Sequence, residues 1–172
     1  MRTWSRQYEA SKTGELASMD RVMEWLPRNI PEQTKVAIDC THSLLTLCQV
    51  SVVHGDFRLD NLIFSPDDPG KVVAVLDWEL STLGDPLADA AYSCLAHHVP
   101  AHFSLLRGVA GLDLASLGIP SAERYLAQYC RNTAAAEVNT WNFYLSFAFF
   151  RIAAILQGVY KRSLQSMIHT DF

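Results

Sequence analysis

Three oxygen-bearing side chains stand at spacings that could support chemistry on a phosphate group. Asp56 and Asn61 are five positions apart, and Asp77 follows sixteen positions after Asn61. We expect Asp56 and Asn61 to lie at opposite ends of a tight loop between two strands. Asp77 would end the next strand and fold back beside them. The pattern therefore predicts a carboxylate base, an amide oxygen and a second carboxylate at one place.

The ligand chemistry of this set is that of a magnesium site. Mg²⁺ takes few protein oxygens, keeps several waters and completes its coordination with phosphate oxygens. Phosphoryl transfer needs a group that orients the attacking hydroxyl and metal ions held against the phosphates. Asp56, Asn61 and Asp77 together meet both requirements.

The elements that must position this set are short strands. Runs of β-branched and apolar residues predict strands at 51–54, 61–64 and 71–77, with a turn at 65–70, SPDDPG. The second and third strands would form a hairpin that Asp77 ends. The stretch after Asp77, WELSTLGDP, is expected to be a loop.

Most of the remaining chain is predicted to be helical. Apolar residues at helical spacing indicate helices at 19–26 (ended by Pro27 and Pro31), 87–97, 121–131 and 138–165. Residues 98–120 are punctuated by Gly and Pro and are expected to be irregular. Residues 34–50 fit either a helix or a buried run. The expected fold class is α+β, mostly helical, with one small β-hairpin at the loop 54–61.

Length and composition set limits on the class of protein. A chain of 172 residues is by default one domain, and 49% hydrophobic with 19% charged residues excludes a disordered chain. A net charge of −4 argues against a nucleic-acid partner, which requires a basic surface. The apolar stretch 143–156 is short for a membrane span and contains Arg151, so we predict a buried core helix and no transmembrane segment.

The cysteines and the first residues indicate an intracellular, reducing location. Cys40, Cys48, Cys94 and Cys130 form no CxxC pair and are interpreted as free thiols. The polar opening, Met1–Lys12, lacks the apolar segment of a secretory signal.

Longer motifs around the three side chains resemble a known family. HGDxxxxN at 54–61, followed by VLDWE at 75–79, resembles the catalytic loop and metal-binding strand of the aminoglycoside phosphotransferase/choline-kinase-like family, which is related to the protein kinases. The surrounding segments are similar to the phosphotransferase domain of acyl-CoA dehydrogenase family members ten and eleven, with member ten the nearer. These segments are VVHGDFRLDNLIF, AVLDWELSTLGDPLADAAYSCLAHH and WNFYLSFAFFRIAAILQGVYKRSL. The resemblance covers residues 1–33 and 52–164.

The resemblance implies a role for each residue of the loop. Asp56 would be the catalytic base that accepts the proton of the substrate hydroxyl. Asn61 and Asp77 would bind Mg²⁺ and through it ATP. His54 would brace the metal-binding segment, and Arg58 would neutralise charge in the transition state, unless it is simply a solvated arginine.

Other residues near the loop have structural interpretations. Asp85 and Asp89, in GDPLAD, match family positions that tie the loop to the following helix. Trp78 and Trp141 are expected in the core, with the flank of an acceptor pocket as the alternative.

The family's nucleotide-covering lobe is not visible in this sequence. No glycine-rich loop precedes His54, and VAI at 36–38 is followed by Asp39 rather than by the lysine of the kinase strand. We therefore expect a single partial domain over 1–172, namely the C-terminal lobe of a kinase-like fold. Residues 34–51 do not resemble the family and are expected to be an insertion.

The resemblance implies a phosphotransferase that uses ATP and Mg²⁺ and acts on a small-molecule hydroxyl. Because related domains are fused to acyl-CoA dehydrogenase modules, it implies a hydroxyacyl-CoA acceptor, association with such a module, and a mitochondrial or peroxisomal location. The alternative is a truncated isoform that is catalytically inactive and serves as a binding or regulatory remnant, because positioning supplies most of the rate in phosphoryl transfer.

Overall fold

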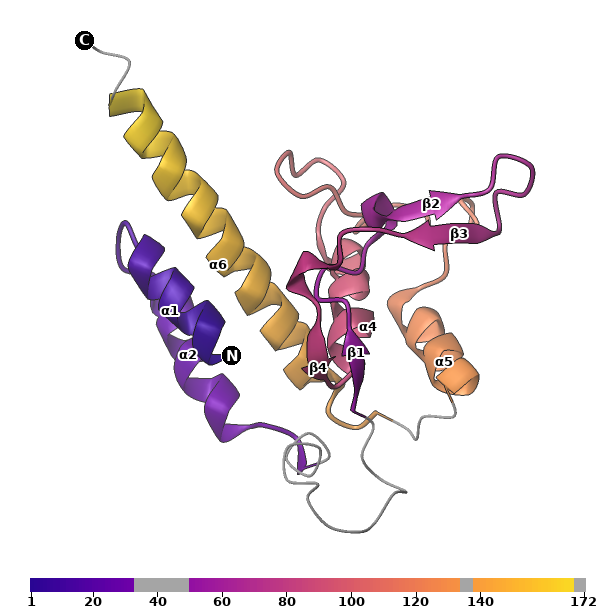
Figure 1. Cartoon of the computed structure of the whole chain (residues 1–172), viewed down its shortest axis with the longest axis horizontal. Helices are drawn as coiled ribbons and strands as arrows, with labels where there is room; N and C mark the ends of the chain where they lie inside the picture. The colour runs from indigo at the N-terminus through magenta and orange to yellow at the C-terminus, as the bar shows by residue number, and fades with distance from the viewer. Residues whose placement is uncertain (33–49, 134–137, 169–172) are drawn as a thin grey trace.

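The structure is a computed structural model that describes residues 1–32, 50–133 and 138–168 (Figure 1). Its elements, with η for a 3₁₀ turn, are α1 (Arg2–Ser11), α2 (Ala17–Arg28), β1 (Ser51–Val53), η1 (Leu59–Asn61), β2 (Leu62–Phe64), β3 (Val72–Val75), η2 (Trp78–Leu80), β4 (Thr82–Gly84), α4 (Leu87–Cys94), η3 (Leu95–His98), α5 (Ala122–Thr133) and α6 (Trp141–Ile168). Helices dominate and the strands are short, which confirms the predicted α+β class.

Helix α6 is the centre of the helical part. It packs against α1, α2 and α4, and Figure 1 shows α1 and α2 on one side of it and the small sheets on the other. The first half of α6 supplies much of the core, as the apolar run predicts, through Phe143, Tyr144, Ala148, Phe150, Ile152 and Ala154. Full burial of a large apolar side chain contributes roughly 1.5–3 kcal/mol.

Helix α6 also satisfies a simple criterion for a membrane span. Within the described residues, Trp141–Ser166 is one helix whose length and apolar composition would suffice to cross a membrane. The core helix of a soluble protein meets the same criterion, and 33% of the most apolar window is buried here. Length and composition are therefore weak evidence for a span.

The strands form two separate antiparallel sheets of two strands each among the described residues. The predicted hairpin is present as β2 and β3, with Leu62 opposite Val75. Strand β1 pairs instead with β4, with Ser51 opposite Gly84. The prediction of a loop throughout 78–86 was therefore wrong at 82–84, because Thr-Leu-Gly is followed by Asp and Pro, which are typical of turns.

Two helical predictions also need correction. Helix α1 was not predicted, because its sequence is polar apart from a few residues that include the buried Tyr8. Helix α2 does not end before Pro27 but contains it and closes at Arg28. A proline in the last turn removes one hydrogen bond, and the helix ends within one residue of it.

The other predicted elements agree within a few residues. Helices α4, α5 and α6 lie where helical spacing placed them, and 98–120 contains no helix or strand longer than an isolated bridge. Cys94 and Cys130 are free thiols. The predictions for residues 34–49, including Cys40 and Cys48, lie outside the described residues.

Candidate active site

The second residue of the loop 54–61 is a glycine, and any other residue there would force the backbone or its neighbours to move. Gly55 has φ +84°, and a Cβ atom at this position would stand 2.5 Å from the backbone oxygen of Leu80. A left-handed backbone is strained for residues with a side chain. Gly55 therefore allows the loop to turn directly against η2.

One face of α4 holds the first half of this loop. The Asp89 carboxylate accepts the backbone N–H of His54 at 2.6 Å and that of Gly55 at 2.9 Å. The Ser93 hydroxyl donates to the backbone oxygen of Phe57 at 2.7 Å. Residues four apart share one face of a helix, so a single side of α4 fixes the loop backbone. The tie that the resemblance implies for Asp89 is present.

Asp85 binds two other groups at the start of α4. Its Oδ1 accepts the backbone N–H of Leu87 at 3.0 Å, and its Oδ2 accepts the Tyr144 hydroxyl at 2.6 Å. It therefore holds the first residue of α4 and anchors this helix to α6.

The His54 ring connects the loop to the strand that precedes Asp77. Its Nδ1 accepts the backbone N–H of Asp56 at 3.1 Å, and its Nε2 lies 2.7 Å from the backbone oxygen of Leu76. Because a carbonyl oxygen can only accept, Nε2 carries the proton and the ring is the neutral Nε2–H tautomer. The ring is 2% exposed and stacks on Trp78 with centroids 4.6 Å apart.

Asp56 and Asn61 are in direct contact. The Asn61 amide nitrogen donates to the backbone oxygen of Asp56 at 2.8 Å and to Asp56 Oδ2 at 3.0 Å. Both amide hydrogens are used in this way, so the Asn61 amide oxygen is left to act as an acceptor or a metal ligand. The spacing between these two residues predicts this proximity.

A backbone hydrogen bond brings the segment that carries Asp77 close to Asn61. The N–H of Leu76 donates to the backbone oxygen of Asn61 at 2.8 Å, which fixes the residue immediately before Asp77. Asp77 itself adopts φ +68°, the one positive φ among the described non-glycine residues, and is exposed. Such outliers persist only where surrounding structure enforces them, and they cluster at functional sites.

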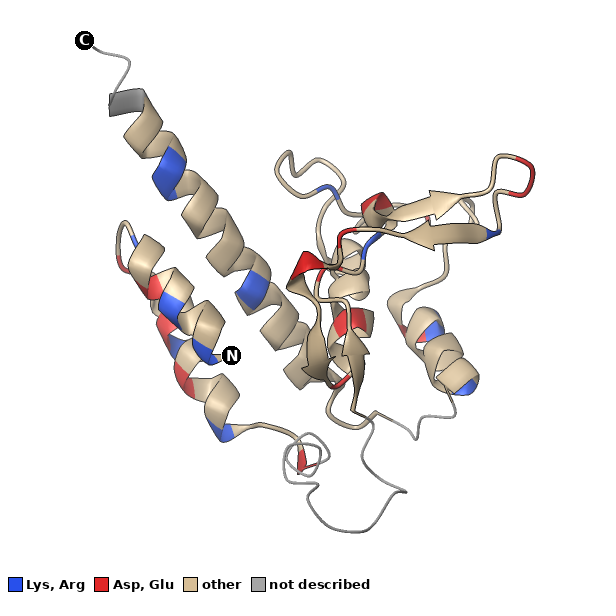
Figure 2. Ribbon diagram, in the orientation of Figure 1, with Lys and Arg blue, Asp and Glu red and all other residues tan. Residues whose placement is uncertain are grey.

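The side chains around the loop 54–61 and Asp77 offer oxygen atoms as metal ligands. Figure 2 shows acidic positions on η1, η2 and α4, around the place where the two small sheets meet. Within the described residues, no three His, Cys, Asp or Glu side chains are grouped so that they alone could hold a metal. A metal here would rely on the Asp77 carboxylate, the Asn61 amide oxygen and oxygens from water or a phosphate, which is the pattern typical of Mg²⁺.

Arg58, within the loop, is partly exposed. It forms an ion pair with Asp60 at 2.7 Å, and the two side chains are 43% and 73% exposed. The structure therefore pairs Arg58 with Asp60 and leaves both side chains partly in solvent.

Comparisons with known proteins show the family of this chain. The family model described as the phosphotransferase enzyme family matches residues 1–138, which is most of the chain. The chain belongs to this family.

Named relatives of this phosphotransferase domain are much longer proteins. Mouse acyl-CoA dehydrogenase family member 10 is 51% identical over 95% of the chain, and human acyl-CoA dehydrogenase family member 11 is 37% identical over 94%. The chain spans 14% and 19% of their respective lengths. A solved Ralstonia eutropha protein, described as an aminoglycoside phosphotransferase, superposes with a TM-score of 0.80 at 44% identity, over 95% of this chain and 45% of that one.

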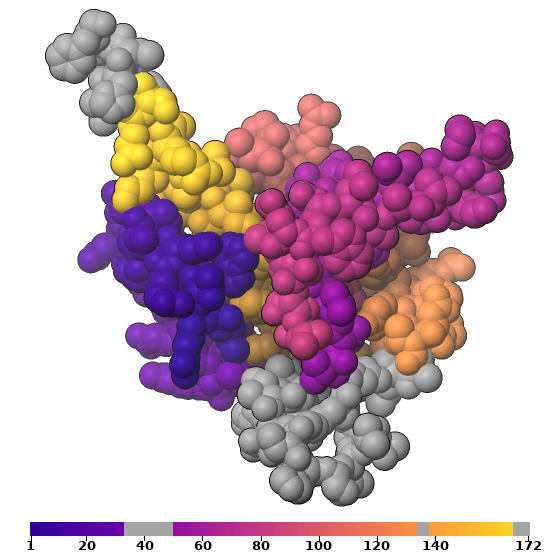
Figure 3. All heavy atoms as spheres, in the orientation of Figure 1, coloured from indigo at the N-terminus to yellow at the C-terminus, as the bar shows by residue number. Residues whose placement is uncertain are grey.

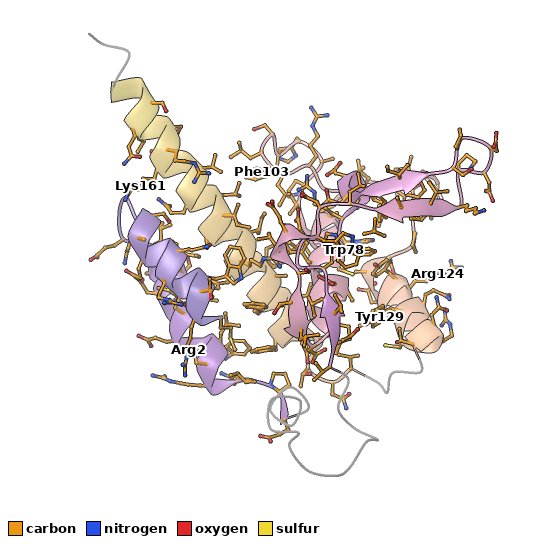
Figure 4. The ribbon with its side chains drawn as sticks, in the orientation of Figure 1. Arg2, Trp78, Phe103, Arg124, Tyr129 and Lys161 are labelled. Atoms are coloured by element: carbon orange, nitrogen blue, oxygen red, sulfur yellow. The ribbon has the colours of Figure 1, made fainter. Side chains whose placement is uncertain are left out.

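An apolar pocket lies behind the loop of this phosphotransferase domain. Its volume is about 240 Å³, and its lining includes His54, Phe57, Trp78, Asp89 and Tyr129. In Figure 4, Trp78 and Tyr129 lie between the small sheets and α5. Trp78 is 48% exposed, so the expectation that it is a core residue was wrong. The Trp78 ring lies against His54, tilted by 49°, and lines the pocket.

Trp141, by contrast, is partly buried and packs against the core at the start of α6, as expected. Tyr144 and Phe150 are buried, and Phe147 packs against them.

Sequence reasoning missed two buried residues of this phosphotransferase domain, Tyr92 on α4 and Arg151 on α6. Burial, followed by charge and hydrogen bonding with the Asp56 carboxylate, raises the pKa of Tyr92 to about 12. Arg151, on α6, lies over the Tyr92 ring with its Cζ 4.8 Å from the ring centroid. The signal available in the sequence was an arginine in the middle of an otherwise apolar helix.

Proposed function

We propose that this domain transfers the γ-phosphate of ATP to the hydroxyl group of a small molecule, with Asp56 as base and Asn61 and Asp77 as magnesium ligands. The observation that carries the proposal is the contact between Asp56 and Asn61 beside the strained Asp77. Membership of the phosphotransferase enzyme family supports the reaction class.

In this proposal, Asp56 receives the proton of the attacking hydroxyl. Asn61 donates to Oδ2 of its carboxylate and to its backbone oxygen, so the orientation of the carboxylate is fixed on one side. A base held within hydrogen-bond reach of the hydroxyl contributes typically 10²–10⁴-fold to the rate. Fixing the orientation matters because phosphoryl transfer depends mainly on positioning.

His54 acts on the site without touching a reactant in this proposal. Its neutral ring joins the backbone of Asp56 to the backbone of Leu76. It therefore sets the separation between the base and the segment that carries Asp77.

Asn61 and Asp77 fit a magnesium ion by the chemistry of their donors. The Asn61 amide oxygen takes no part in its two bonds to Asp56, and among the described residues no hydrogen bond or ion pair engages the Asp77 carboxylate. Bound Mg²⁺ neutralises the phosphate charge of ATP and the charge that develops in transfer. Arg58 would add positive charge at the rim of the loop.

A thermal unfolding experiment tests the metal and nucleotide part of the proposal. Saturating Mg²⁺-ATP, at about a hundred times its Kd, stabilises a folded protein by roughly 2.7 kcal/mol. We expect this shift in the wild-type chain, no shift with ATP and EDTA, and no shift in Asp77→Ala. A shift that persists in Asp77→Ala would remove Asp77 from the metal site.

The acceptor is proposed from the names of the relatives. Because two of them are called acyl-CoA dehydrogenase family members, we propose a hydroxyacyl-CoA acceptor and association with an acyl-CoA dehydrogenase module, in a mitochondrial or peroxisomal compartment. Transfer of labelled phosphate to hydroxyacyl-CoA, compared with the same hydroxy acid without CoA, tests the acceptor. Equal transfer to both would show that CoA is not recognised.

A second candidate function is suggested by the small number of glycines before the loop 54–61. Before Gly55 the sequence contains only Gly14, so no glycine-rich loop is available in this stretch to cover the phosphates. Where no other part of the protein covers the phosphates, these residues would serve as a binding or regulatory form without transferring phosphate. A cooperative unfolding transition that ignores Mg²⁺-ATP favours this candidate.

A further inference from the structure

Helix α5 lines two neighbouring cavities. The first is the apolar pocket behind the loop 54–61, with a volume of about 240 Å³, and Tyr125 and Tyr129 line it from α5. The second has a volume of about 480 Å³ and is lined from α5 by Arg124, Tyr125 and Gln128. Because residues four apart share one face of a helix, Tyr125 and Tyr129 form one stripe, with Arg124 and Gln128 in the stripe beside it. The two cavities are therefore adjacent, and Tyr125 belongs to both.

The first cavity suits an uncharged, apolar group. Four aromatic rings from the loop, η2 and α5 line it, namely Phe57, Trp78, Tyr125 and Tyr129. Of the described residues in its lining, Asp89 is the one acid, and its two oxygens already accept backbone N–H groups of the loop. None of these residues is a lysine or an arginine, so an anionic group would be left unpaired there.

The size of the first cavity suits part of a ligand. Pockets that hold a whole small molecule usually measure about 300–1,000 Å³, which is more than the volume of about 240 Å³ here. His54 and Phe57, which stand before and after Asp56 in the sequence, both line the cavity. An apolar chain that fills it would therefore contact the loop that carries the proposed base.

The second cavity supplies the positive charge that the first one lacks. Arg124 lines it, and within the described residues no ion pair or side-chain hydrogen bond engages the Arg124 guanidinium. The neighbouring Gln128 is already bonded, since its amide donates to Asn132 and accepts from Arg131. A guanidinium fits the oxygens of a phosphate or a carboxylate. Together the two cavities match a ligand with an apolar chain and an anionic head.

We propose that the cavity lined by Phe57, Trp78 and Tyr129 binds the apolar chain of the acceptor, and that Arg124 binds the anionic head of the same molecule. This inference rests on the proposed function, because the acyl-CoA acceptor named there combines a chain with phosphates. It adds a location for the chain, against the loop that carries Asp56, and a residue for the head.

Calorimetric titration of the full chain, without ATP or Mg²⁺, tests this binding. The probes are octanoyl-CoA, CoA and octanoate. We expect octanoyl-CoA to bind at least about tenfold more tightly than CoA, because each buried methylene contributes roughly a fourfold gain in affinity. It should also bind more tightly than octanoate, which lacks the phosphates. The inference fails if octanoyl-CoA does not bind, or if CoA or octanoate binds as tightly.

Two substitutions address the two cavities separately. Ala90 lines the first cavity and is 3% exposed, so Ala90→Leu should fill it and reduce the affinity for octanoyl-CoA to that for CoA, with CoA binding unchanged. Arg124→Ala should weaken octanoyl-CoA and CoA alike, by about tenfold. The matched control is Arg6→Ala, which removes an exposed arginine from α1 and should change neither affinity. Equal losses in Arg124→Ala and Arg6→Ala would overturn the role of Arg124.

Val52 offers a second test of the first cavity if Ala90→Leu does not fold. It lines the same cavity from β1 and is 58% exposed. Val52→Phe should therefore narrow the cavity without disturbing the core, and aromatic residues are favoured in strands. We expect weaker binding of octanoyl-CoA and unchanged binding of CoA. If a folded variant binds octanoyl-CoA as tightly as the wild type does, the chain does not lie in this cavity.

Binding is measured without phosphate transfer, so the two proposals can fail separately. A chain that binds octanoyl-CoA as expected but transfers no phosphate keeps this binding site and loses the proposed reaction. A chain that phosphorylates hydroxyacyl-CoA with the same KM before and after Ala90→Leu keeps the reaction and loses the binding site.

Discussion

The helical core and the loop 54–61 are held by different kinds of interaction. The core around α6 depends on apolar burial, which is not directional and involves many side chains such as Leu26 and Phe150. The loop depends on a few directed hydrogen bonds, from Asp89, Asn61 and His54. Stability and site geometry should therefore respond to different substitutions, and the predictions below test how far this separation holds.

The two regions meet on α4. Leu87 and Ala91 on α4 and Leu95 at the start of η3 belong to the core cluster, while Asp89 binds the loop. Tyr92 is connected with both, because it is a member of the core cluster and the charge of Asp56 contributes to its raised pKa. The separation should hold everywhere except at this helix.

The largest expected effect is on the reaction. Asp56→Asn should lower phosphoryl transfer by about 10²–10⁴-fold, because the amide cannot accept the hydroxyl proton. The amide oxygen can still accept the bond from Asn61, so the unfolding midpoint should be unchanged. Transfer assays and thermal unfolding of the same sample check both halves. Retained turnover would contradict the role of Asp56 as base.

The largest expected effect on stability lies in the core. Leu26 is 2% exposed on α2, and Leu26→Ala should lower the free energy of unfolding by roughly 2–5 kcal/mol through lost burial and the cavity left behind. Urea titration measures this loss. The stabilisation by Mg²⁺-ATP should remain at the same size. If it disappears, the core and the loop are not separable.

A smaller effect is expected where the loop turns against η2. Gly55→Ala should cost roughly 1–3 kcal/mol for backbone strain, with a further cost because its Cβ would meet the Leu80 oxygen. Two other glycines make matched controls: Gly118 has φ +68° and open space, and Gly14 has open space and no positive φ. The expected order of destabilisation by alanine is Gly55, Gly118, Gly14, measured by urea titration. Equal losses at Gly55 and Gly118 would show that η2 moves aside.

The smallest effect on stability is expected at the exposed ion pair. Arg58→Ala and Asp60→Ala should each change the free energy of unfolding by about 0–1 kcal/mol, because both side chains lie in solvent. If Arg58 neutralises charge in the transition state, only Arg58→Ala lowers the rate of transfer. Equal rates in the two variants would leave Arg58 as a solvated arginine.

The sequence predicted the local parts of this site well. The hairpin, its turn and the approach of Asn61 to Asp56 follow from spacing within some twenty residues. Strand β4 could not be predicted, because Thr-Leu-Gly is followed by Asp and Pro, which are typical of turns, and its partner is β1, far back in the chain. Tyr92 and Arg151 were missed because only the packing of α4 against α6 brings the arginine over the Tyr92 ring.

The two small sheets have a consequence for handling the protein. Because each described sheet has two strands, every strand presents one unpaired edge, which is a template for pairing with another chain. The β2–β3 hairpin projects from the body in Figure 3, and Ile63, Phe64, Val72 and Val73 on it are exposed. Concentrated samples should therefore self-associate edge to edge, and a lysine placed at Val73 should raise the solubility limit without touching the site.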